Sequence, residues 1–280
     1  MYIVRKIGFV ENRHDYVKQR VGQRGCERFW GNYARKKESN KYFDSGILMQ
    51  QLTDNCDRYF KKCDDCGEKC THPSGECSGS CVDCLEEIHY HRFDGRAEYD
   101  CKNMLRYYTC HTIWKRCSEM IYALETLDLE KYSKLNILSI GCGAAPDLMA
   151  FQKVADEKEI SYHGIDIEGK WGDIHDFIAR KTEGQDVNFE RCDIYEMLNR
   201  ADAINSRNYN VLILQYMIAG HIYSDRAEKI DFLFDELIDK LIVEKPQNSP
   251  LLLIINDIDH KAWICDHFNL FTRKLRKRGF

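Results

Sequence analysis

The stretch NILSIGCGAAP, residues 136–146, decides the fold. It is an apolar run that ends in Gly141 and Gly143 and leads into PDLMAFQKVADEKE, a segment of helical character. Glycines at such a junction let a ligand approach the backbone closely, and the N-terminus of the following helix offers free N–H groups. The stretch therefore predicts a strand, a ligand-binding turn and a helix, in that order.

Similar apolar runs recur through the C-terminal half of the chain and alternate with amphipathic segments. This alternation predicts an α/β fold, with a Rossmann-like parallel sheet and helices on both of its faces. Apolar residues at three- and four-residue steps predict a further helix over 102–127, ahead of the sheet. Besides 135–143, the expected strands are 161–168, 187–194, 210–218 and 251–258, and the helices between them include 172–182 and 227–244.

Two acidic residues follow the second and third of these strands. Asp166, in the run GIDIE, lies at the end of the second strand, 23 residues after Gly143, and Asp193 follows FERC. A carboxylate at the first of these positions can accept both hydroxyls of a ribose. A carboxylate at the second can face an adenine amino group.

With these motifs, residues 135–257 resemble the class I S-adenosylmethionine (SAM)-dependent methyltransferases. The resemblance implies that Gly141, Gly143 and Ala144 lie alongside the methionine part of SAM. It also implies that Asp166 binds the ribose and that Asp193 lies on the adenine side. Without the resemblance, the same segment is also consistent with a Rossmann-like domain that binds another nucleotide, or none.

The sequence departs from the family pattern in three places. Ser139 stands where the family usually has an acid, and Ala145 stands at its usual last glycine. Two closing strands normally follow the fifth strand, but residues 258–280 look helical. The closing strands are therefore missing, lost by truncation, or supplied by the β-like N-terminal residues 1–10.

No motif in the sequence identifies the methyl acceptor. The acceptor site of the family usually lies beyond the fourth strand, which here corresponds to residues 214–221, LQYMIAGH. We expect His221 to act as a general base and Tyr216 to orient the acceptor. The alternative for each is a loop side chain that only packs or caps.

Cysteine spacing predicts a metal site in the N-terminal part. Seven of the 14 cysteines lie within residues 56–84, in a glycine-dotted polar segment that cannot build a hydrophobic core. Two CxxC pairs are typical of a four-thiolate zinc site, and the remaining cysteines and histidines suffice for a second zinc. An iron–sulfur cluster on the CxxxCxxC spacing is the alternative. The pairs are Cys63 with Cys66 and Cys81 with Cys84; Cys56, Cys70 and Cys77 are candidates for the second zinc.

Charge is distributed unevenly along the chain. Residues 1–41 contain 11 Lys/Arg against four Asp/Glu, and residues 273–278 contain five basic residues, whereas the formal net charge of the chain is −4. This asymmetry favours an anionic partner, with nucleic acid bound through the basic N-terminal segment and the C-terminal tail.

The sequence thus predicts a two-part protein. Residues 1–100 form the basic segment and a zinc-stabilised cysteine-rich module, and residues 101–280 form the SAM-binding domain. The function expected is methyl transfer to RNA or DNA, with the zinc module docking the substrate. The alternatives are a methyltransferase of proteins or small molecules, and a non-catalytic adaptor or sensor. No signal peptide or membrane span is recognisable, which indicates a cytoplasmic protein.

Overall fold

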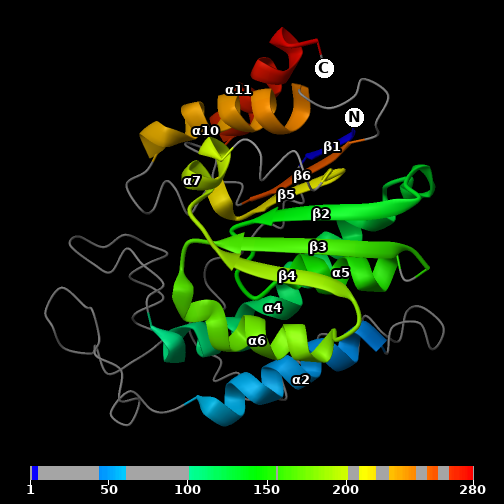
Figure 1. Cartoon of the computed structure of the whole chain (residues 1–280), viewed down its shortest axis with the longest axis vertical. Coiled ribbons are helices and arrows are strands. Elements are labelled where there is room, and N and C mark those ends of the chain that lie inside the picture. Colours follow the sequence, from blue (N-terminus) through cyan, green and yellow to red (C-terminus); the bar gives the residue numbers. More distant parts are fainter. Residues whose placement is uncertain are drawn as a thin grey trace, which may run out of the picture.

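The computed structural model shows a parallel sheet covered by helices on both faces (Figure 1). The predicted α/β class is therefore confirmed for the part of the chain that the structure describes. The described residues are 2–5, 44–60, 101–155, 157–200, 208–218, 227–243, 251–257 and 265–279.

The sheet has six strands in the order β1-β6-β5-β2-β3-β4, and every adjacent pair is parallel. The chain runs outward from β2 through β3 to β4, and then returns to the other side of β2 to form β5 and β6. The order therefore reverses between β2 and β5, the arrangement of doubly wound sheets. The strands are β1 (Tyr2–Arg5), β2 (Lys134–Ile140), β3 (Glu159–Asp166), β4 (Asp186–Arg191), β5 (Val211–Gln215) and β6 (Leu252–Asn256).

The N-terminal strand β1 takes the sheet position beside β6. Tyr2 pairs with Leu252 and Arg5 with Ile255. No strand follows β6 among the described residues, because the next described element is a helix. Within the described ranges, the N-terminal region thus supplies one strand at the edge where two closing strands were expected.

One face of the sheet is covered by α2 (Asp44–Tyr59), α4 (Lys102–Glu125), α5 (Pro146–Val154) and α6 (Gly172–Lys181). The predicted helix over 102–127 is α4, and its buried side chains Ile113, Cys117 and Leu124 lie on the expected apolar stripe. Helix α2 contributes Met49 and Leu52 to the same core. Burial of these side chains away from water holds the helices on the sheet.

The other face is covered by α7 (Ile194–Asn199), α10 (Ile230–Leu237) and α11 (Cys265–Lys277). Helix α10 continues as a π-helical turn, η6 (Ile238–Val243). Phe234 of α10 and Phe271 of α11 are both buried and meet edge to face, with ring centroids 4.7 Å apart. Because both faces are covered, β5 and β6 are almost fully apolar.

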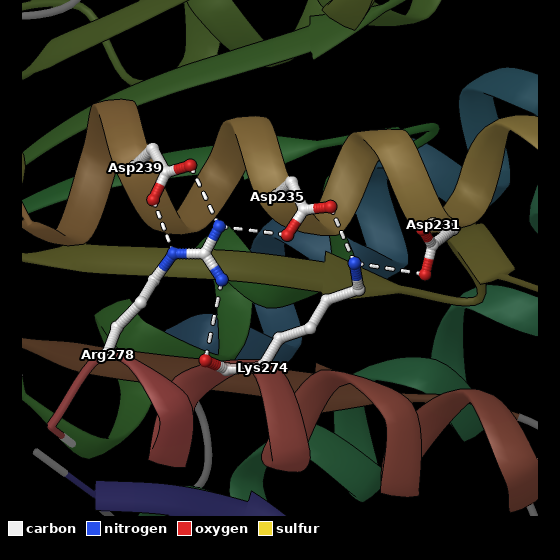
Figure 2. A network of polar contacts seen from close by, with 5 residues as sticks. All are labelled: Asp231, Asp235, Asp239, Lys274 and Arg278. Atoms are coloured by element: carbon white, nitrogen blue, oxygen red, sulfur yellow. Dashed lines mark hydrogen bonds and ion pairs between the residues drawn. The ribbon is translucent and has the colours of Figure 1, made fainter.

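A charged seam also joins α10 and η6 to α11 (Figure 2). Lys274 lies between two aspartates, with its Nζ 3.0 Å from Asp231 Oδ1 and 2.6 Å from Asp235 Oδ2. Arg278 donates from Nη2 to Asp235 at 2.9 Å and to Asp239 at 2.8 Å. The three aspartates recur every four residues on one helical face, so two basic side chains spaced by four residues can match them.

None of the described helices combines the length and the apolar character that crossing a bilayer requires.

Candidate cofactor site

A pocket opens at the carboxyl ends of β2 and β5, on either side of the point where the strand order reverses. Open α/β sheets bind their ligands at this topological position. The wall of the pocket comes from α4, from the turn after β2, from the start of α5 and from the end of β5. The lining residues are Tyr108, Thr112, Ile113, Arg116, Ser139, Gly141, Cys142, Gly143, Ala144, Pro146, Asp147, Gln215 and Tyr216.

The turn after β2 has the glycine-dependent shape that the sequence predicts. Gly141 and Gly143 adopt left-handed φ angles of 68° and 51°. The backbone N–H groups of Gly141 and Cys142 both donate to Ile165 O, at 2.9 and 3.0 Å, which ties the turn to β3. Ala145 also has a left-handed φ of 51°, so the position where the family usually has a glycine keeps a glycine-like backbone conformation. Gly141, Gly143 and Ala144 all line the pocket, and their contact with a cofactor stays a prediction.

Asp166, at the end of β3, lies directly beside this turn. Its Oδ2 accepts a hydrogen bond from the Gly143 N–H at 2.9 Å, and its Oδ1 accepts one from the Glu168 N–H at 2.9 Å. Burial raises the pKa of Asp166 to about 6, although the two backbone N–H groups partly offset the effect. The structure thus brings Gly143 and Asp166 together, 23 residues apart in sequence. Asp166 is not itself one of the residues that line the pocket, and its ribose-binding role stays a prediction.

Asp193 lies farther along the same edge of the sheet, after β4. It is the N-cap of α7, and its Oδ1 accepts a hydrogen bond from the Tyr195 N–H at 2.9 Å. Asp193 is not one of the described residues that line the pocket. Its adenine-side role therefore stays a prediction.

Tyr216, the expected acceptor-orienting residue, lines the pocket and has a left-handed φ of 58°. This conformation is costly for an aromatic residue and persists only where the surroundings fix it. Here the Tyr216 N–H donates to Asn256 O at 2.7 Å, and its hydroxyl donates to Glu119 Oε2 at 2.7 Å. His221, the other candidate catalytic residue, lies outside the described residues.

The predicted zinc ligands Cys63, Cys66, Cys70, Cys77, Cys81 and Cys84 also lie outside the described residues. Cys56, the remaining candidate for the second zinc, belongs to α2 and is buried in the hydrophobic core, only 1% exposed, where it packs as a small apolar side chain. Within the ranges that the structure describes, no group of three or more His, Cys, Asp and Glu side chains is arranged to hold a metal ion. The zinc module therefore stays a prediction.

Two charged side chains of the pocket were not among the predicted site residues. Asp147, in the first turn of α5, is 1% exposed and accepts a hydrogen bond from the Tyr162 hydroxyl at 3.1 Å. Burial raises its pKa to about 6, while a hydrogen bond with Ser139 lowers it. Ser139 therefore has a carboxylate beside it, supplied by the helix that follows. An acid at the helix start was the available signal, because anions are favoured there.

Arg116 is the second of these residues. It lies in the middle of α4, and its side chain reaches the pocket wall. Its Nη1 atom is buried and has no hydrogen-bond partner among the described residues. A buried guanidinium donor without a partner is costly, so its presence in a pocket indicates a place for an anionic ligand group.

A histidine supports the turn from behind. His175 Nε2 lies 2.7 Å from Gly143 O, and because a carbonyl only accepts, this nitrogen carries the proton. Burial lowers the pKa of His175, which favours the neutral ring. The ring stacks on Phe189, with centroids 4.3 Å apart, and on the buried Trp171. These contacts hold the turn in the shape that the pocket requires.

Comparison with known proteins identifies no family. No protein-family model matches the chain, and no curated protein matches it at a significant level. Among solved structures, the chain is similar to the bifunctional kinase-methyltransferase WbdD at 15% identity and a TM-score of 0.30, covering 57% of this chain and 33% of that one. It is also similar to the plantazolicin methyltransferase BpumL in complex with SAH, at 18% identity and a TM-score of 0.32, covering 57% and 54% of the two chains.

A third similar structure is a cyclopropane-fatty-acyl-phospholipid synthase-like protein from Lactobacillus casei, at 13% identity and a TM-score of 0.32. The likeness covers 60% of this chain and 70% of that one. The chain spans only a third of WbdD and about half of BpumL. Identities and TM-scores this low identify no activity, so the function proposed below rests on the geometry of the site.

Proposed function

We propose that this protein is a SAM-dependent methyltransferase. The observation that carries the proposal is the pocket at the reversal point of the sheet, where the left-handed turn at Gly141 and Gly143 lies against the carboxylate of Asp166. The pocket also fits the chemistry of SAM, since the unpartnered Nη1 of Arg116 can receive the carboxylate of an amino acid. The left-handed φ angles of Gly141 and Gly143 give this turn a backbone shape that residues with side chains rarely adopt.

Each part of the site would hold a different part of the cofactor. Gly141, Gly143 and Ala144 would pass the methionine part, Asp166 would accept the ribose hydroxyls, and Asp193 would lie on the adenine side. When bound, SAM supplies an already activated methyl group, so the protein mainly has to orient the acceptor and exclude water. Tyr216, fixed on the pocket wall, would orient the acceptor, and His221 would take its proton.

Calorimetric titration with SAM and with S-adenosylhomocysteine (SAH) tests the proposal. We expect both ligands to bind, and Asp166→Ala to weaken binding roughly 10- to 100-fold because the ribose loses a charged acceptor. Glu183→Ala, which removes an exposed acid close to α6, is the matched control and should bind normally. Absence of binding to zinc-replete protein, or full binding by Asp166→Ala, would contradict the proposal.

For the acceptor we propose nucleic acid, RNA or DNA, docked with the help of a zinc module formed by the cysteine-rich segment. The support is the basic composition of residues 1–41 and the spacing of the two CxxC pairs. Metal analysis should find zinc; iron with acid-labile sulfide would instead support the cluster alternative. Incubation with labelled SAM should label RNA or DNA. Labelling of protein alone would show that the methyl acceptor is protein and not nucleic acid. SAM binding without any labelling would favour an adaptor or sensor.

A further inference from the structure

The residue Glu119 is almost fully buried, although its side chain is ionisable, and it lies outside the wall of the pocket. It projects from α4, and only 4% of its surface is exposed. Its Oε2 accepts one hydrogen bond from the Tyr216 hydroxyl at 2.7 Å and another from the Asn256 side-chain amide at 3.2 Å. One carboxylate oxygen thus joins α4, the end of β5 and the end of β6. A buried carboxylate is costly unless it is hydrogen-bonded, so this arrangement calls for a reason beyond packing.

The contacts continue from Glu119 to the pocket through Tyr216. The guanidinium of Arg116 lies over the ring of Tyr216, an arrangement in which the cation is attracted to the aromatic face. The neighbouring Gln215 donates from its side-chain amide to Arg116 O at 3.1 Å, which fixes this turn of α4 to the end of β5. Glu119 therefore sets the place of Tyr216, and Tyr216 sets the plane of the Arg116 guanidinium.

The result is a charged donor held ready for a ligand. Arg116 Nη1 is buried, has no partner in the described part of the chain, and belongs to a residue that lines the same pocket as Gly141 and Gly143. Asp147, a buried carboxylate, lines this pocket as well. A cation and an anion in one cavity suit a ligand end that carries both charges, as an amino acid does.

We propose that Arg116 binds the carboxylate at the amino-acid end of the cofactor, and that Glu119 is a positioning residue that acts through Tyr216 to hold the guanidinium in place. This inference rests on the proposed function and deepens it. Glu119 does not touch the ligand; it removes the rotational freedom that Arg116 would otherwise lose when the ligand binds.

Two ligands separate this role from a general effect on the fold. SAH carries the amino-acid end, whereas 5′-methylthioadenosine keeps the adenine and ribose but lacks that end. Arg116→Met should weaken SAH binding about 10- to 100-fold and leave methylthioadenosine binding unchanged. Glu119→Gln should weaken SAH binding about tenfold, again without an effect on methylthioadenosine.

Tyr216→Phe completes the test, because it removes only the hydroxyl that reaches Glu119. It should act like Glu119→Gln, and the double variant should be no weaker than either single variant, because both changes break one connection. Glu125→Gln, an exposed acid on the same helix, is the matched control. Thermal unfolding with and without methylthioadenosine shows whether each variant is folded.

The outcomes distinguish this inference from the proposed function. Equal weakening of SAH and methylthioadenosine by Glu119→Gln would show a merely structural residue and overturn the positioning role. An unchanged preference for SAH in Arg116→Met would overturn the carboxylate assignment. If the wild-type protein bound neither ligand, the proposed function would fall, and this assignment with it.

Discussion

If Asp166 binds the ribose as proposed, ligand binding should depend on pH, because burial raises the pKa of Asp166 from the ordinary 3.8 to about 6. An ionised carboxylate accepts hydrogen bonds from both ribose hydroxyls, whereas a protonated one loses much of this capacity. We therefore expect SAH affinity to be constant above pH 7 and to fall, by up to about tenfold per pH unit, as the pH drops below 6. Calorimetry between pH 5 and pH 8 would measure this slope.

Two variants identify the group responsible. Asp166→Asn should bind weakly at every pH and show no slope. Asp147→Asn is needed beside it, because burial raises the pKa of Asp147 to about 6 as well. A slope retained in Asp166→Asn but lost in Asp147→Asn would contradict the assignment to Asp166. In both groups the folded state favours the protonated form, so each also disfavours folding as the pH rises from about 4 to 6.

At this scale the sequence predicts the residues that a local motif specifies. Gly141, Gly143 and Asp166 follow from the end of a strand and its neighbours, and they lie where the motif implies. Arg116 and Glu119 could not be predicted, because their spacing on α4 shows only which helix face they share. Their proposed roles depend on contacts with Tyr216, which lies about 100 positions later in the chain. Tertiary packing, which the sequence does not show, places Tyr216 opposite α4.

Among the elements, α11 depends on its charged seam with α10 and η6. Lys274→Met removes a cation that contacts Asp231 and Asp235, and its side chain is only 13% exposed. We expect the free energy of unfolding in urea to fall by roughly 1 kcal/mol, with a smaller loss at high salt because the attraction is screened. Arg273→Met, an exposed cation of the same helix, should change the stability little.

The seam should also respond to acid. Partial burial raises the pKa of Asp235, but hydrogen bonds and charges from Lys274 and Arg278 outweigh this and lower it. A carboxylate with a lowered pKa stabilises the fold at neutral pH and loses this effect as the pH falls below its ordinary value of 3.8. The difference between the wild type and Lys274→Met should therefore shrink in acid. A difference that persists there would mean that packing, not charge, makes the contribution.

The positions of most elements could be predicted from periodicity, since apolar runs and amphipathic segments coincide with β2 to β6 and with α4, α6 and α10. The limits of α5 and the π-helical turn η6 could not, because helix ends depend on capping and packing. The basic tail, residues 273–278, shows the same limit, since five of its six residues are cationic and the sequence does not distinguish among them. Only the fold reveals that Lys274 and Arg278 contact aspartates (Figure 2). Arg273, Arg276 and Lys277 of the same tail are exposed.

On the scale of the whole molecule, the tail contains two kinds of basic residue: Lys274, which contacts aspartates, and Arg276 and Lys277, which are exposed. This difference gives the nucleic-acid proposal a specific test. If RNA or DNA binds the chain through phosphates, log affinity should fall linearly with log salt concentration. Replacing Arg276 and Lys277, both exposed, by Gln should reduce that slope by about one for each lost contact. Lys274→Met should leave the slope unchanged. Binding that is insensitive to salt would remove nucleic acid as the partner.

The pairing of β1 with β6 gives the fold a particular order of events during translation. Tyr2 leaves the ribosome long before Leu252, its partner in the sheet, has been made. Among the strands that the structure describes, β1 is therefore made before β6 and completes its pairing late, and until then its backbone N–H and C=O groups lack their partner in this sheet. Until β6 is made, the nascent chain must keep β1 from pairing with other strands. The rate of translation and the binding of chaperones therefore influence whether β1 takes its place at the edge of the sheet.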